Sequence, residues 1–147
     1  MISMPRLVSF LALSLAAGSA FSAAAPPSTG LGQAWPNATD VSVSPRYHVY
    51  VFERHGIRYV QVNDLNGTVR AAFGTAAGDV FALPIGMDAD RLVTLSEPVA
   101  AATAATGETV YRDENTSVNA TPLSDGGIRM LVVGTCDNPA QCSIQGH

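Results

Sequence analysis

The residues able to do acid–base or metal chemistry are few, and their spacing brings none of them together. The three histidines are His48, His55 and His147. His48 falls in an alternating stretch, and His55 precedes Gly56 in a predicted turn. A catalytic or metal-binding His needs partners that converge on it, and the spacing assigns it none. We therefore predict no catalytic residue and no metal ligand.

Cofactor and nucleophile motifs are also lacking. The chain has no Gly-x-Ser-x-Gly elbow, no His-Glu-x-x-His pair and no Gly-rich phosphate loop. Asn63 to Gly67 partly matches a calcium loop, but only Asp64 and Asn66 fit as ligands and no acid follows at the required distance. An Asn-Gly turn is the better interpretation, so we predict no cofactor. Neighbouring acids in polar stretches are expected to be solvated, namely Asp88 with Asp90 and Asp113 with Glu114.

The elements that would position any site begin with a hairpin. His55-Gly56 separates two runs that alternate with a period of two, Tyr47–Arg54 and Ile57–Asn63. Gly accepts positive φ freely and His tolerates it, so a two-residue turn is expected there. The predicted pairs are Arg54 with Ile57, Glu53 with Arg58, Phe52 with Tyr59, Val51 with Val60 and Val49 with Val62.

A second hairpin is predicted at Asn66-Gly67, the strongest short turn signal in the chain. It places Val62 opposite Ala71 and Val60 opposite Phe73. The resulting sheet has two chemically different faces. The expected core face is aliphatic and holds Val49, Val51, Val60, Val62, Val69, Ala71 and Phe73. The other face is the candidate binding face and holds Tyr50, Phe52, Tyr59, Arg54 and Arg70, since Tyr and Arg are enriched at interfaces.

Four later segments complete the expected fold. Turn residues at 75–78 and 86–90 bound a strand over Asp79–Ile85, and alternation predicts strands over 91–96 and at 110–112. The Ala-rich stretch 97–109 is expected to be a loop. Ile128–Thr135 is an apolar strand that we expect to return and pair with the meander. The prediction is an all-β domain of about six strands, mainly an antiparallel meander, forming a small sheet, barrel or sandwich.

The first 25 residues have the features of a cleaved signal peptide. Arg6 precedes a short apolar run, Leu7 to Leu15, and small residues follow up to Ala25. The run is shorter than the roughly 20 apolar residues of a membrane span, so no transmembrane anchor is expected after cleavage. Residues 26–45 are expected to be a flexible linker rich in Pro, Ser and Thr, leaving residues 46–147 as one β domain. Trp35 in the linker is interpreted either as an anchor on the domain or as an exposed contact.

The two cysteines bear on the compartment of the protein, and its charge excludes one class of partner. Cys136 and Cys142 enclose five residues, and after export a disulfide between them is the default, giving a C-terminal disulfide loop. The chain contains no Lys, and its net charge is −4. Without clustered positive charge we predict no nucleic-acid partner. Basicity supplied by Arg alone, together with abundant Ala and Gly, is typical of a bacterial protein.

These observations favour a periplasmic or secreted protein that is not an enzyme. We expect a binding or interaction module of the bacterial envelope, with a protein or small-molecule partner that the sequence does not name. The alternative is a small secreted hydrolase with an unrecognised site. Clustering of His48 with Asp64 or Glu53 in a pocket would favour the enzyme, and an uncovered aromatic face would favour binding.

Overall fold

Strands make up nearly all of the regular structure. The computed structural model describes residues 26–94 and 107–134. Its two sheets are antiparallel apart from one short parallel pair, which confirms the all-β prediction. The proposed signal peptide, most of the Ala-rich stretch and both cysteines, Cys136 and Cys142, lie outside the described residues. Within the described ranges, no helix is long and apolar enough to cross a membrane.

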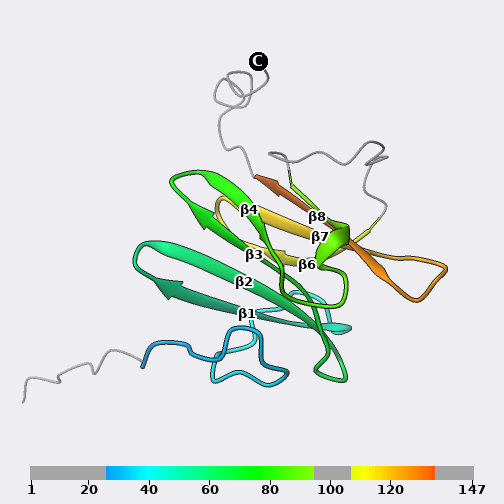
Figure 1. Cartoon of the computed structure of the whole chain (residues 1–147), viewed down its shortest axis with the longest axis horizontal. Helices are drawn as coiled ribbons and strands as arrows, with labels where there is room; N and C mark the ends of the chain where they lie inside the picture. Colours follow the sequence, from blue (N-terminus) through cyan, green and yellow to red (C-terminus); the bar gives the residue numbers. More distant parts are fainter. Residues whose placement is uncertain (1–25, 95–106, 135–147) are drawn as a thin grey trace, which may run out of the picture.

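The first sheet is the predicted meander (Figure 1). Its strands, in sequence and spatial order, are β1 (Tyr47–Arg54), β2 (Ile57–Asp64), β3 (Val69–Ala76) and β4 (Asp79–Leu83). The β1–β2 turn is the expected two-residue one, because His55 and Gly56 have φ of 52° and 78°, and every predicted pair across it is confirmed. Pro84, which has no N–H to donate, follows the end of β4 directly.

The second hairpin differs from the prediction by one residue. Its loop is Leu65 to Gly67, closed by Asp64 N–H donating to Thr68 O at 3.0 Å, with Gly67 at φ 83°. Asn63 then pairs with Val69, and a bulge restores the predicted pairs further along the strands. Arg70 is the extra residue of this bulge. The two-residue alternation that assigned it to the aromatic face therefore does not hold at that position.

The second sheet contains the largest corrections. Its strands are β5 (Leu92–Val93), β6 (Glu108–Arg112), β7 (Thr116–Pro122) and β8 (Ile128–Gly134), in the order β5-β8-β7-β6. A single turn of 3-10 helix, η1 (Ala89–Arg91), precedes β5, so the strand expected over 91–96 begins later and is short. The prediction that β8 pairs with the meander is wrong, because β8 lies between β5 and β7.

Strand β7 was not predicted, and its composition explains why. Thr, Ser, Asn and Pro dominate it, so it lacks the apolar alternation that marks the other strands. Only Val118 and Ala120 contribute apolar side chains to the core. Pairing with both β6 and β8 satisfies its backbone, and this tertiary contact outweighs its weak local preference.

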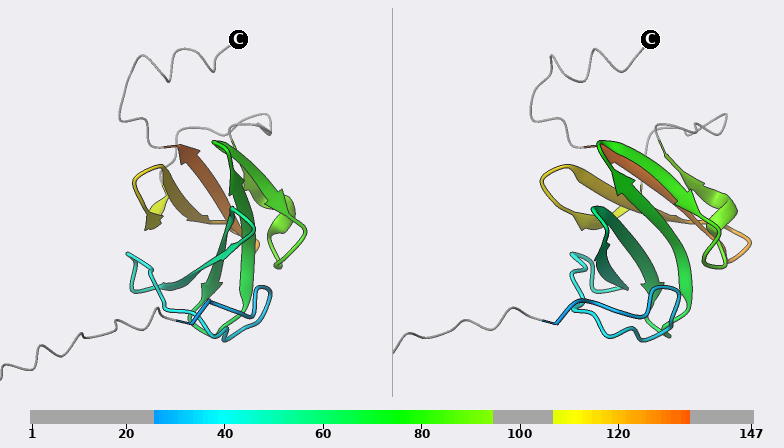
Figure 2. Two further views of the ribbon diagram at one scale, coloured as in Figure 1. Left: turned by 90° about the vertical axis from the view of Figure 1, so that its left-hand side faces the viewer. Right: turned by 60° about the vertical axis from the view of Figure 1, so that its left-hand side comes forward.

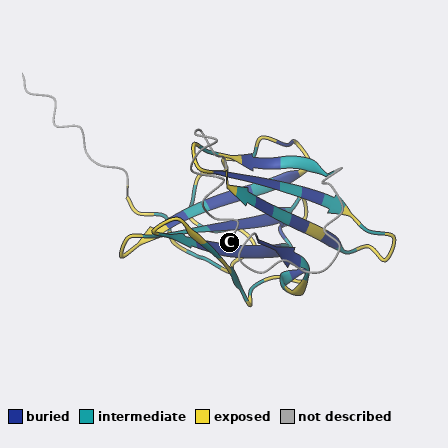
Figure 3. Cartoon of the chain, turned by 90° about the horizontal axis from the view of Figure 1, so that it is seen from above, coloured by how far each residue is buried: buried dark blue, intermediate teal, exposed yellow. Residues whose placement is uncertain are grey.

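The core lies between the two sheets (Figure 3), where the centres of the strands are buried and the hairpin tips are exposed. The predicted aliphatic face supplies its first half, which confirms that part of the expectation, although Val69 is only partly buried and lies outside the core cluster. The inner side chains of the first sheet are Val49, Val60, Val62, Ala71 and Phe73. Those of the second include Val110, Val118, Ala120, Met130 and Val132.

A segment before β1 joins the two sheets along one edge. Val41 N–H donates to Val49 O of β1 at 2.8 Å, and Val43 N–H donates to Val110 O of β6 at 3.0 Å. Ser44 Oγ adds a 2.7 Å hydrogen bond to Glu108. The segment thereby occupies backbone groups at the edges of both sheets, where unpaired strands would otherwise invite association.

Candidate functional site

Residues 32–35, which precede the segment that joins the two sheets, cover part of the outer face of the meander. This is the face turned away from the second sheet. Figure 2 shows the segment, in blue to cyan, on the side of the first sheet away from the second. The side-chain amides of Gln61 and Asn63, both fully buried, hold it in place. Gln61 accepts from Gly32 N–H at 2.6 Å and donates to Gln33 O at 2.8 Å. Asn63 donates to Ala34 O at 2.7 Å.

These hydrogen bonds fix the backbone immediately before Trp35. The indole rests on Gly67 so closely that a Cβ there would lie 2.7 Å from Cε2. Trp35 is nevertheless 60% exposed. The side chain is therefore both anchored to the domain and open to solvent, which joins the two interpretations that the sequence offered for it.

An imidazole–carboxylate pair lies beside the indole. The rings of Trp35 and His48 meet edge to face with centroids 5.4 Å apart. His48 Nδ1 lies 2.7 Å from Asp40 Oδ2, while Asp40 Oδ1 accepts from the backbone N–H groups of Ser42 and Val49. Burial acts to raise the pKa of Asp40, but these hydrogen bonds outweigh it and the pKa is lowered. Asp40 is thus a carboxylate acceptor at neutral pH, and His48 Nδ1 donates to it.

This tautomer determines what the pair offers a ligand. With Nδ1 bound to Asp40, Nε2 is the ring nitrogen of His48 left for a ligand. Tyr50 stacks with His48, with centroids 6.3 Å apart and planes 21° apart. The Trp35 site, defined here as Trp35, His48, Asp40 and Tyr50, combines an open aromatic surface, an imidazole and a carboxylate.

The residues of the predicted binding face are separated by the structure. Tyr50 and Phe52 are each only 5% exposed, whereas Tyr59 is half-buried. Arg54 is exposed at the end of β1, next to the His55 turn. Four of the five therefore share one side of the sheet, but its two central aromatic rings are not open to solvent.

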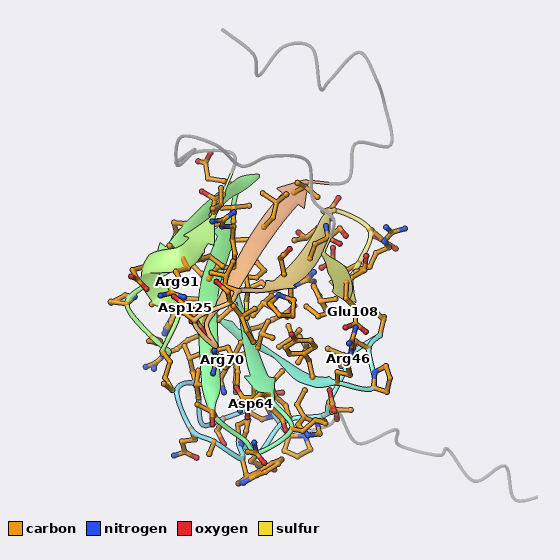
Figure 4. The ribbon with its side chains drawn as sticks, turned by 90° about the vertical axis from the view of Figure 1, so that its right-hand side faces the viewer. Arg46, Asp64, Arg70, Arg91, Glu108 and Asp125 are labelled. Atoms are coloured by element: carbon orange, nitrogen blue, oxygen red, sulfur yellow. The ribbon has the colours of Figure 1, made fainter. Side chains whose placement is uncertain are left out.

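Arg70 lies elsewhere, between Asp64 and the Arg91–Asp125 pair (Figure 4). It donates to Gly126 O at 3.2 Å and lies 2.6 Å from Asp88 Oδ2 and 3.7 Å from Asp64 Oδ2. The Asp88 contact is an ion pair without hydrogen-bond alignment, and Asp88 Oδ2 has no hydrogen-bond partner among the described residues. Asp88 Oδ1 accepts from Ile128 N–H. Arg70 therefore helps to join the two sheets.

Two of the acids predicted to be solvated are not. Asp88 is only 3% exposed, because the bulge and η1 bring it against Arg70. Asp113 accepts from the Tyr111 hydroxyl at 2.7 Å and from Arg58 at 2.9 Å. Both carboxylates serve packing between the sheets, and neither lies in the Trp35 site.

His48 does not cluster with either acid that would have favoured an enzyme. Glu53 accepts from Arg58, and Asp64 caps the Asn66-Gly67 turn through the backbone N–H groups of Asn66 and Thr68. In the part of the chain that the structure describes, no group of three His, Cys, Asp or Glu side chains could hold a metal ion. The Asp40–His48 pair is the arrangement closest to acid–base chemistry here.

Sequence reasoning missed Asp40, Gln61 and Asn63 as site residues. Asp40 lies eight positions before His48, and nothing in that spacing marks it as the partner of the ring. Gln61 and Asn63 look like ordinary outward-facing polar residues of β2. The one local signal was Trp35 itself, a large aromatic residue in an otherwise small and polar stretch.

No family model, curated protein or solved structure matches this chain. The candidate site therefore depends on its own geometry and chemistry.

Proposed function

We propose that this protein is a small, exported, non-enzymatic binding module of the bacterial envelope and that it binds its partner through the Trp35 site. The observation that carries the proposal is the exposure of Trp35 combined with its fixed position. A Trp that is 60% exposed leaves a large apolar surface in water. Trp is also among the residues that most often dominate binding energy at interfaces.

The buried amides support this interpretation. Gln61 and Asn63 direct their hydrogen bonds to the backbone of residues 32–34, directly before the indole. A ring that is already held in place loses little further conformational entropy on binding. Export through the predicted signal peptide would place this surface in the periplasm or outside the cell, where an envelope partner is available.

A pull-down of envelope extract with the mature protein tests the proposal. Trp35→Ala should lose the partner that the wild type captures. Leu65→Ala is the matched control, because Leu65 is also exposed, at 54%, in the turn that Trp35 covers. Retention of every partner by folded Trp35→Ala would rule the site out. Tyr50→Ala is a poor probe, since Tyr50 is buried and its loss would disturb packing.

A second candidate function, a small hydrolase, is favoured by one observation, the Asp40–His48 pair. A carboxylate that orients a neutral imidazole is the arrangement of a general base. No hydroxyl or thiol nucleophile is hydrogen-bonded to His48 within the described ranges. His48→Gln would abolish turnover of chromogenic ester substrates if the enzyme interpretation were correct, whereas a binding module turns over none.

A further inference from the structure

We propose that the Trp35 site recognises a cationic side chain, Arg or Lys, of a partner protein. This inference rests on the proposed function, because it names the ligand chemistry of the same site. The indole supplies the surface on which the cation lies, and Asp40 supplies the opposite charge. His48 holds the Asp40 carboxylate, which accepts an N–H group of the ligand.

The aromatic part of the inference follows from the indole's surroundings. Among aromatic side chains, Trp attracts cations most strongly, because the face of its ring is electron-rich. The indole of Trp35 contacts Gly67 and His48, yet Trp35 is 60% exposed. A planar guanidinium or an ammonium group can therefore approach the uncovered part of the ring without displacing any described side chain.

The charge part of the inference follows from the way Asp40 is paired. Arg side chains neutralise most of the other paired carboxylates, whereas the partner of Asp40 is His48. The side chain of Asp40 is 38% exposed. Asp40 is therefore a carboxylate that a cation lying on the indole can reach. The net charge of −4 has the same sign and would steer cations toward the molecule.

The hydrogen-bond part distinguishes a protein side chain from a quaternary ammonium ion. Nδ1 of His48 donates to Asp40 and holds the carboxylate beside the indole, where its oxygens can accept N–H groups from a ligand. Guanidinium and primary ammonium groups carry N–H donors, and tetramethylammonium carries none. The site should therefore bind Arg and Lys side chains in preference to a methylated cation of equal charge.

The chain is well suited to a direct test, because Trp35 is its only Trp. One indole N–H cross-peak in a ¹H–¹⁵N spectrum then reports on the site alone. The mature protein is titrated at constant ionic strength with N-acetyl-arginine methylamide, N-acetyl-lysine methylamide and tetramethylammonium chloride. N-acetyl-citrulline methylamide is the neutral isostere of the arginine ligand. We expect a saturable shift with the arginine and lysine ligands, a weaker one with tetramethylammonium, and none with citrulline.

Two variants separate the charge of Asp40 from general effects. Asp40→Asn should weaken arginine binding about threefold, the scale of one exposed opposite charge. Asp79→Asn, the matched control, removes an equally charged exposed residue at the start of β4 and should change nothing. Should Asp40→Asn fail to fold, salt provides the second measurement. Raising ionic strength from about 20 mM to about 500 mM should weaken wild-type binding, because exposed charges are then screened.

The outcomes divide clearly. Equal shifts with arginine and citrulline, or binding by Asp40→Asn equal to wild type, would overturn cation recognition. Absence of any shift would overturn it as well. If Trp35→Ala still loses a partner in the pull-down, the binding function stands with a different ligand chemistry. If no ligand shifts the indole signal and Trp35→Ala keeps every partner, both proposals fail.

Discussion

The indole of Trp35 lies on Gly67, at a distance that no side chain at position 67 would allow. A Cβ there would come within 2.7 Å of Cε2 and 2.9 Å of Nε1. Gly67 also has φ of 83°, a conformation that the hairpin loop requires. One glycine thus serves both the turn between β2 and β3 and the position of the exposed ring, although 32 positions along the chain separate the two residues.

Gly67→Ala should therefore have two effects. Positive φ costs a residue with a Cβ about 1–2 kcal/mol, and the displaced indole should change its fluorescence emission. Gly78→Ala is the control, because Gly78 has φ of 90° but nothing within 4 Å of the added Cβ. Both variants should unfold at lower urea concentration, and only Gly67→Ala should shift the emission of the folded state. An unchanged spectrum would contradict the contact.

Asn63→Ala should loosen the segment before Trp35. It removes the donor to Ala34 O and the acceptor for Gln61 Nε2, leaving buried groups unpaired at a cost of about 1–3 kcal/mol. Hydrogen exchange measured by mass spectrometry should show faster exchange over residues 27–43. Val132→Ala, a core variant in the second sheet, should lower global stability without this local effect. Equal protection of residues 27–43 in wild type and Asn63→Ala would contradict the role of Asn63 in holding this segment.

Arg70→Met should be strongly destabilising, because it leaves the Asp88 carboxylate buried without its cation. Breaking one side of a buried pair typically costs about 3–5 kcal/mol. Arg91→Met breaks the exposed pair with Asp125 and should cost far less, because solvent-exposed ion pairs contribute little to stability. Urea unfolding of the two variants makes the comparison. Similar midpoints would mean that the Arg70–Asp88 pair does not hold the sheets together.

Acid should destabilise the fold through Asp113. Burial acts to raise the pKa of this carboxyl, but hydrogen bonds from Tyr111 and two backbone N–H groups, with the charge of Arg58, lower it overall. A carboxyl whose pKa is lower in the folded state stabilises the fold above its unfolded pKa. That stability is lost as the pH falls through the folded pKa. Asp125 behaves alike, since its hydrogen bond with Arg91 lowers its pKa to about 2.

The unfolding free energy, measured from about pH 6 down to about pH 2, checks this expectation. Asp113→Asn should be less stable than wild type near pH 6 and should lose less stability on acidification, so the two curves converge at low pH. Parallel curves would show that Asp113 does not contribute to the acid sensitivity.

The disulfide expected between Cys136 and Cys142 stays a prediction, as does the signal peptide. Intact-mass measurement of the exported protein, with and without reductant, would settle the first, and N-terminal sequencing the second.

The sequence by itself determined the first sheet. Alternating side chains and the His55-Gly56 turn specify the meander's faces and its β1–β2 register, because a slip of one residue would move every apolar side chain out of the core. These signals are local, since they depend on backbone geometry within a few residues.

Only the tertiary structure decided what covers each face. Strand β7 forms because β6 and β8 flank it, although its own residues favour no strand strongly. The bulge turns Arg70 toward Asp88, and the segment before β1 brings Asp40 to His48 and Trp35 to Gly67. Such contacts join residues that share no periodic pattern, so their free energy is gained only when the whole chain is packed. The candidate site is built from contacts of this kind, which is why the sequence pointed to the centre of the outer face and the structure points to its edge.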